Sequence, residues 1–96
     1  MNGTATRKVE GGKLVRIDVS FGKSIQEVRI TGDFFLHPED TILELERTLS
    51  HAALPLQKEL LEKDIQETIA KHHAVLIGLS AADLVSVLEE ALRCTA

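Results

Sequence analysis

Residues capable of acid–base chemistry gather in one short stretch, Gly32–Glu39, where His37 lies between the carboxylates Asp33 and Glu39. A histidine that a neighbouring carboxylate orients can act as a general base. Transfer chemistry would also require a nucleophile, and this stretch contains neither serine nor cysteine. His37 also stands where the N-cap of a helix belongs, and Asp33 where a strand ends, so structural or interface roles are favoured. We therefore predict no catalytic residue in this chain.

The spacing of the histidines and of the single cysteine does not favour a metal site. Zinc requires three or four ligands. His37 and His51 are isolated, and the adjacent His72 and His73 would point roughly 100° apart on a helix. Cys94 allows neither a disulfide framework nor a cysteine cluster within one chain, which favours a reducing, cytoplasmic location. We predict no metal site and interpret this thiol as a bystander.

Recognition of nucleotides or nucleic acids is also disfavoured. The chain has no Walker-type loop and no GxGxxG after a strand, and Gly11-Gly12-Lys13 is more typical of a turn than of a phosphate cradle. Residues 1–32 carry six Lys and Arg against three acids, and residues 33–96 carry five against twelve, which gives +3 and −7 and a total of −4. A basic sheet could attract an acidic partner. Such a charge is also common on a solvated hairpin, and we favour that interpretation.

The pair Phe34-Phe35, between a strand and a proline-initiated helix, has no role in the preceding interpretations. Adjacent side chains on an extended segment face opposite ways, so one phenylalanine can enter the core while the other stays at the surface. An apolar side chain left at the surface indicates a partner. We predict a partner interface that contains Phe34, Phe35, His37 and Glu39, with Lys13 as a further contact to a phosphate or an acidic surface.

Strands are expected in the first third of the chain. Alternating apolar residues predict strands at about 13–21 and 24–33, and a shorter strand at about 6–9. Gly22-Lys23 predicts a two-residue type II′ turn between the two longer strands, because such a turn has glycine first. The pattern indicates a small antiparallel three-stranded sheet.

Helical spacing follows the strands. Pro38 and Pro55 are expected at the first positions of two helices, and Ser80 with Asp83 has the spacing of a capping box for a third. Val75–Gly78 is too short to classify by periodicity and is expected to be coil. The predicted helices cover about 38–50, 55–73 and 80–93.

Length and composition agree with one folded domain over residues 1–96. A chain of 96 residues buries only roughly 60–65% of its unfolded surface, so a deep active-site cleft within it is not expected. No apolar run reaches the roughly 20 residues that span a bilayer, and the polar N-terminus does not resemble a signal peptide. We predict an α+β domain, with no membrane contact, in which three helices cover one face of the sheet.

Three segments together resemble the C-terminal accessory domain of lipoate–protein ligases. They are Gly12–Val19, Gly32–Glu39 and Gly78–Leu84, of which the second, GDFFLHPE, is the most specific. The resemblance covers nearly the whole chain. Because the chain begins with its own Met1 and contains none of the catalytic-domain motifs, it is similar to the split form that has a separate catalytic subunit. The resemblance implies a SufE/NifU-like α+β fold.

The resemblance also implies a function in a heterodimer. The catalytic subunit would bind lipoate, ATP and Mg²⁺ and form lipoyl-AMP. This chain would be needed for that activation step and less for transfer to the lysines of lipoyl domains, which it would meet only indirectly. The family supplies no catalytic residue for this chain and no cofactor that it would bind alone.

Two other classes of function stay open. An independent interaction module, either a homodimer or an adaptor for lipoyl domains, fits a small α+β domain with an apolar patch equally well. Sulfur transfer is suggested by the SufE-like fold, but a fold does not by itself give a function. That role would require Cys94 as a reactive acceptor thiol.

Overall fold

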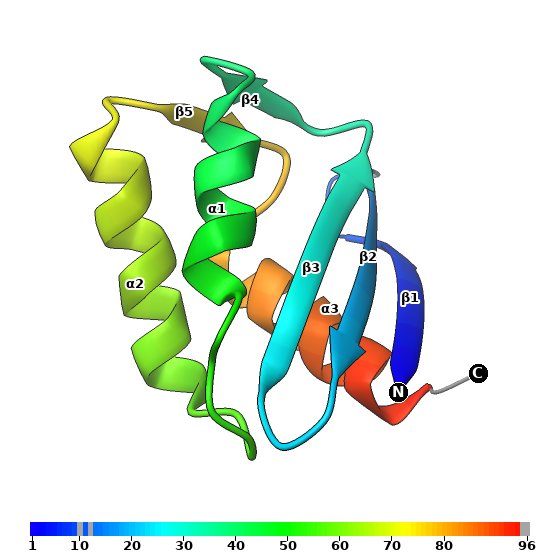
Figure 1. Cartoon of the computed structure of the whole chain (residues 1–96). Helices are drawn as coiled ribbons and strands as arrows, with labels where there is room; N and C mark the ends of the chain where they lie inside the picture. The colour runs from blue at the N-terminus through cyan, green and yellow to red at the C-terminus, as the bar shows by residue number, and fades with distance from the viewer. Residues whose placement is uncertain (10, 12, 95–96) are drawn as a thin grey trace.

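The computed structural model describes residues 1–9, 11 and 13–94, and it contains two small antiparallel sheets and three helices (Figure 1). The first sheet has the order β1-β2-β3, and the second pairs β4 with β5. The predicted α+β class and its three-stranded antiparallel sheet are confirmed. The elements are β1 (Asn2–Lys8), β2 (Leu14–Phe21), β3 (Ile25–Gly32), β4 (Phe35–His37), α1 (Thr41–Leu49), α2 (Lys58–Lys71), β5 (Val75–Ile77) and α3 (Ala81–Arg93).

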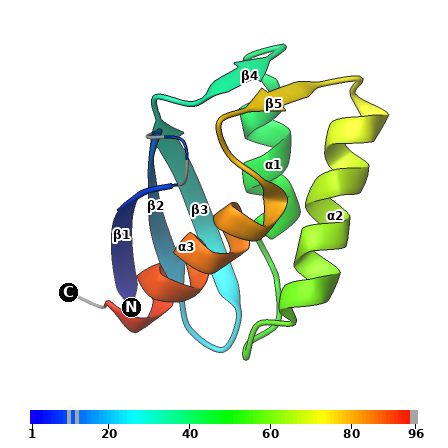
Figure 2. The ribbon, with the colours of Figure 1, turned by 180° about the vertical axis from the view of Figure 1, so that it is seen from behind.

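The three helices lie on one side of the three-stranded sheet, as predicted. Figure 2 shows α3 crossing the sheet on that side, where it contacts β1 and β2. Helix α1 contacts β3, and α2 contacts both other helices. The alternation in β2 produces this layer, because Val15, Ile17, Val19 and Phe21 all face the helices and are buried. The buried face of α3 completes the core with Leu84, Val85, Val87, Leu88 and Ala91.

The turn between β2 and β3 differs from the predicted type II′ turn. Phe21 pairs with Ile25, and the register shifts between Ser20 and Phe21, so three residues form the loop. A type II′ turn requires a positive φ at its first central residue, and Gly22 does not have one. The bulge lengthens the loop by one residue, and the N–H of Gly22 closes it by donating to the carbonyl of Ser24 at 3.0 Å.

Two predicted helices begin too early. Helix α1 starts at Thr41 rather than at 38, and its N-cap is Asp40, because Pro38 lies in a turn in which its carbonyl accepts from the N–H of Thr41. Helix α2 starts at Lys58 rather than at 55. Before Pro55, Ala53 forms an isolated antiparallel bridge with Ser24, and the carbonyl of Ala52 accepts a hydrogen bond from the N–H of Ile25 at 2.9 Å, so this segment is joined to the start of β3.

The other boundaries need smaller changes. Strand β1 runs over Asn2–Lys8 instead of 6–9, β3 ends at Gly32, and α2 ends at Lys71 instead of 73. The capping box before α3 is confirmed, since the Ser80 hydroxyl accepts from the N–H of Asp83 at 3.1 Å and the Asp83 carboxylate accepts from the N–H of Ser80 at 3.0 Å. Gly12, part of the predicted Gly11-Gly12 turn, lies outside the described residues.

The expectation of coil at Val75–Gly78 was wrong. Residues Val75–Ile77 form β5, which pairs with β4 in the register Phe35↔Ile77, Leu36↔Leu76 and His37↔Val75. The two strands lie about forty positions apart in the sequence, so no local periodicity can show that they meet. They form a short ribbon at one end of the molecule (Figures 1 and 2).

Candidate functional site

The β4–β5 ribbon has one face directed away from the core, and we call it the ribbon face. It consists of Phe35, His37, Val75 and Ile77, which share a face because they pair two by two across the ribbon. Phe35, Val75 and Ile77 are 52%, 49% and 56% exposed, respectively. The rings of Phe35 and His37 stack, with centroids 6.3 Å apart and planes 12° apart. The chain thus presents an apolar surface with one imidazole in it.

The opposite face of the ribbon faces the core. Leu36 is buried, and Leu76 packs against the core as a partly buried side chain. Phe34 also packs against the core, whereas Phe35 is exposed. The prediction that the two phenylalanines separate between core and surface is confirmed. Phe34 therefore supports the ribbon from the core side, and Phe35 is the exposed aromatic ring of the ribbon face.

The remaining two predicted interface residues lie at the borders of the ribbon. Lys13 packs its aliphatic stem against Gly78, directly after β5, because a Cβ at Gly78 would lie 2.6 Å from Lys13 Cγ. Glu39 is exposed and borders a hollow of about 260 Å³ between the end of β3, β4 and the start of α1. Phe34 and Phe35 line the same hollow. The structure thus brings all five predicted residues to one end of the molecule.

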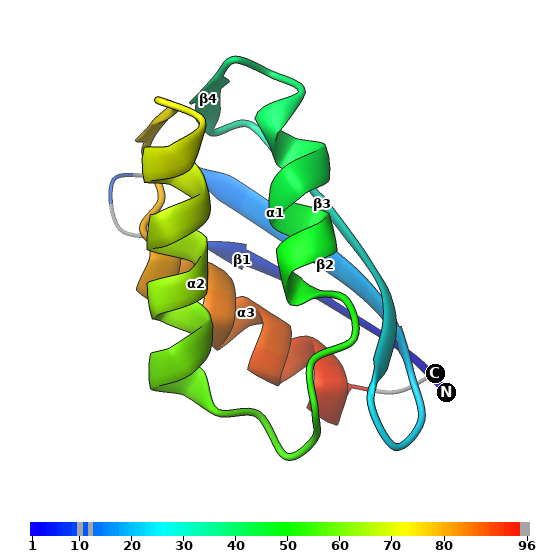
Figure 3. The same cartoon turned by 60° about the vertical axis from the view of Figure 1, so that its left-hand side comes forward.

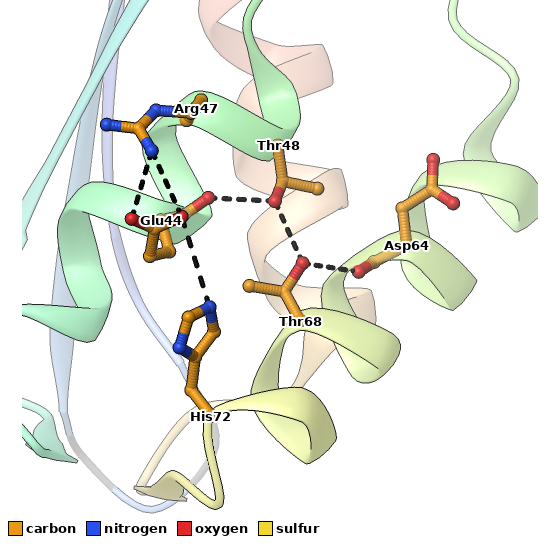
Figure 4. Close-up of polar contacts among 6 residues, drawn as sticks. All are labelled: Glu44, Arg47, Thr48, Asp64, Thr68 and His72. Atoms are coloured by element: carbon orange, nitrogen blue, oxygen red, sulfur yellow. Dashed lines mark hydrogen bonds and ion pairs between the residues drawn. The ribbon is translucent and has the colours of Figure 1, made fainter.

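The helices α1 and α2 position the ribbon. Helix α1 follows β4 and α2 precedes β5, and the two helices lie side by side (Figure 3). Figure 4 shows the polar contacts between them: the hydroxyls of Thr48 and Thr68 are 2.9 Å apart, and His72 Nε2 lies 3.9 Å from a carboxylate oxygen of Glu44. The carbonyls of Glu44 and Asp64, one turn earlier in the same helices, also lie within hydrogen-bond distance of Thr48 and Thr68, so one hydroxyl donates to its partner across the helices while the other donates within its own helix. These contacts, which we call the α1–α2 clamp, join the helix that follows β4 to the helix that precedes β5.

Within the part of the chain that the structure describes, His37 forms no ion pair with a carboxylate. Asp33 is engaged at the end of the sheet, where its carboxylate accepts from the N–H of Leu14 at 2.5 Å and its own N–H donates to the carbonyl of Leu14 at 3.1 Å. His37 lies in β4 and stacks on Phe35, so the N-cap role considered from the sequence belongs to Asp40 instead.

Other groups with metal-binding or nucleophilic chemistry lie apart. Over residues 1–9, 11 and 13–94, no group of three or more His, Cys, Asp or Glu side chains has the arrangement of a metal site. His72 caps the end of α2 and His73 has a positive φ of 51°. Cys94 is exposed at the end of α3, and its carbonyl accepts from the N–H of Thr4 at 3.3 Å.

A second exposed surface lies on the side of the three-stranded sheet that the helices leave uncovered, and we call it the open face. It holds a hollow of about 460 Å³ whose lining includes Thr4, Arg16, Asp18 and Arg29. Arg16 donates to both carboxylate oxygens of Asp18, each at 3.2 Å. Partial burial raises the pKa of Asp18, but hydrogen bonds from Thr4 and Arg16 and the charges of Arg16 and Arg29 outweigh it and hold the pKa below its usual value. On this face, Arg16 and Asp18 form an ion pair within the chain.

Comparison with known proteins adds one solved structure. No family model matches this chain, and no curated protein matches it. The chain is similar to a chain of a structure of an archaeal lipoylation system, a bi-partite lipoate protein ligase and its E2 lipoyl domain from Thermoplasma acidophilum. The similarity covers 92% of this chain and 94% of that chain, with 26% identity and a TM-score of 0.73. The resemblance to a two-part lipoate–protein ligase system is confirmed.

Sequence reasoning missed half of the ribbon face. Val75 and Ile77 were not among the predicted interface residues, although their alternation with Leu76 is the one local signal of a half-exposed strand. Three residues are too few for that signal to be decisive.

No helix of the described residues is both long and apolar enough to cross a membrane.

Proposed function

We propose that this chain is the non-catalytic small subunit of a two-subunit lipoate–protein ligase. The supporting observation is the similarity to a chain of the archaeal bi-partite system over nearly the full length of both chains. A match of that extent relates whole domains rather than a shared motif. The proposal places the chain with the ligase rather than with the lipoyl domain, because the segments that resemble the ligase accessory domain include the complete Gly32–Glu39 run.

The proposed role is to enable the ATP-dependent activation of lipoate. The catalytic subunit would bind lipoate, ATP and Mg²⁺ and form lipoyl-AMP, which then reacts with the lysine of a lipoyl domain. The residues described here offer no cluster of three metal-binding side chains, so the proposal assigns Mg²⁺ and ATP to the catalytic subunit. The small subunit would order loops that exclude water and position the ATP phosphates, since such ordering lowers the barrier by orientation and desolvation.

The decisive experiment compares adenylation with and without this chain. The catalytic ligase subunit of the same organism is mixed with lipoate, ATP and Mg²⁺, and pyrophosphate release is followed. We expect the rate to rise at least roughly tenfold when this chain is added in equimolar amount. Equal rates in the two reactions would end the proposal.

The same reaction shows whether this chain is a subunit of the ligase or an acceptor of the lipoyl group. After complete reaction with a lipoyl domain present, the mass of each protein is measured. We expect the lipoyl domain to gain one lipoyl group and this chain to keep its mass. A lipoyl group found on a lysine of this chain would instead place it on the acceptor side of the system.

A further inference from the structure

The ribbon face is built as a contact surface that the chain itself does not cover. Apolar side chains normally turn inward, yet β4 and β5 hold Phe35, Val75 and Ile77 about half exposed on one continuous face. Their intervening partners Leu36 and Leu76 already anchor the ribbon to the core. About half of the surface of each exposed side chain therefore stays in contact with water.

The surroundings of the ribbon face have the composition of an interface. Stacked aromatic rings and aliphatic residues stand at the centre, and the charged residues Lys13 and Glu39 stand at the border. An apolar centre with a polar rim is the usual anatomy of a protein interface. The hollow beside Phe34 and Phe35, about 260 Å³ in volume, can receive a side chain from a partner.

Shape argues for a larger partner rather than a second copy of this chain. The ribbon lies at one end of a molecule whose extents are 32 × 26 × 22 Å (Figure 1), so a flat partner that meets this end covers little beyond the ribbon face. A stable interface takes roughly 20–30 residues from each side, many more than the four residues of the ribbon face. A partner with a groove can enclose the end of the molecule and also reach Lys13 and Glu39.

We propose that the ribbon face, with Phe35, Val75 and Ile77 as its apolar centre, docks in an apolar groove of the catalytic subunit, which inserts a side chain into the hollow beside Phe34. This inference rests on the proposed function and identifies the surface that carries it. It adds Val75 and Ile77, from β5, to the residues of β4 that the sequence indicates. The α1–α2 clamp is then a device that positions the docking ribbon.

The test is a binding titration of the catalytic subunit with variants of this chain. Ile77→Asp buries an unpaired charge in the proposed interface, so we expect the dissociation constant to rise roughly 50-fold or more. Phe35→Ala should raise it roughly tenfold. Calorimetric titration measures both, and thermal unfolding checks that each variant is folded.

Leu60→Asp is the matched control, because Leu60 is as exposed as Phe35, at 52%. It lies near the start of α2, at the opposite end of that helix from the ribbon (Figure 3). We expect its affinity for the catalytic subunit to equal that of the wild type. Equal weakening by Leu60→Asp and Ile77→Asp would overturn the proposed surface.

Failure of the surface and failure of the function give different results. If the wild type stimulates adenylation and Ile77→Asp binds as well as the wild type, the function stands and the surface is wrong. If the wild type neither binds the catalytic subunit nor stimulates it, both are wrong. A concentration-dependent dimer of this chain alone that Ile77→Asp dissociates would show a second copy as the occupant and overturn the proposal.

Discussion

The ribbon face and the open face of the sheet are both exposed, but their side chains differ in polarity and in the contacts they make. On the open face, Arg16 and Asp18 neutralise each other, and Thr4 and Arg29 add to the stabilisation of the same carboxylate. On the ribbon face, Phe35, Val75 and Ile77 have no polar group to hydrate. Water solvates the charged groups of the open face well. Covering the ribbon face removes apolar surface from water, which is favourable. The larger hollow is therefore not the better candidate for a protein partner.

The largest expected effect distinguishes the two sides of the ribbon. Leu36→Ala removes a buried side chain that anchors β4, and we expect a loss of about 3 kcal/mol in the free energy of unfolding. Phe35→Ala, one position away on the exposed side, should change it by less than about 1 kcal/mol. Urea unfolding of the two variants measures both values. Similar losses would mean that Phe35 belongs to the core and would weaken its assignment to an interface.

The link between the sheet and the ribbon is the next most sensitive point. A Cβ at Gly32 would collide with the carbonyl oxygen of Leu14, so we expect Gly32→Ala to cost about 2 kcal/mol. Gly22→Ala is the control, because its Cβ would lie 3.8 Å from the nearest atom, Gln26 Nε2, and its effect should stay within about 0.5 kcal/mol. Chemical denaturation checks both. A tolerated Gly32→Ala would show that this end of the sheet can shift.

The clamp between α1 and α2 should have a smaller effect on stability. Thr48→Val and Thr68→Val each remove one hydroxyl of the 2.9 Å pair, at an expected cost of about 1 kcal/mol each. The double variant should cost less than the sum, since the second substitution removes a hydroxyl whose partner is already gone. Thermal unfolding of the four proteins gives the coupling. Strict additivity would contradict a hydroxyl pair that joins the two helices.

The smallest effect concerns the open face and its dependence on pH. The pKa of Asp18 is lowered in the folded state, so its carboxylate stabilises the fold above the unfolded pKa, and this contribution is lost as the pH falls through the folded pKa. We expect Asp18→Asn to cost about 0.3 kcal/mol at pH 7, because the group is largely solvated. The difference from the wild type should vanish in strong acid. A difference that grows as the pH falls would reverse the assigned direction.

Local sequence patterns determined most of the three-stranded sheet and the third helix. The alternation of Val15, Ile17, Val19 and Phe21 decides which side of β2 is buried, because a period of two places these residues on one face. The spacing of Ser80 and Asp83 determines where α3 begins, since the capping box needs only neighbouring residues. The sequence also indicated that Phe34 and Phe35 separate between core and surface.

Only the tertiary structure decided what stands beside Phe35. β5 pairs with β4 from about forty residues away, and Lys13 reaches Gly78 from the segment directly before β2. Contacts between distant segments depend on how α1 and α2 pack. A short stretch of sequence carries no information about that packing. The Gly32–Glu39 stretch could thus be recognised from the sequence, while the ribbon face to which it contributes half exists only after β5 has paired with it.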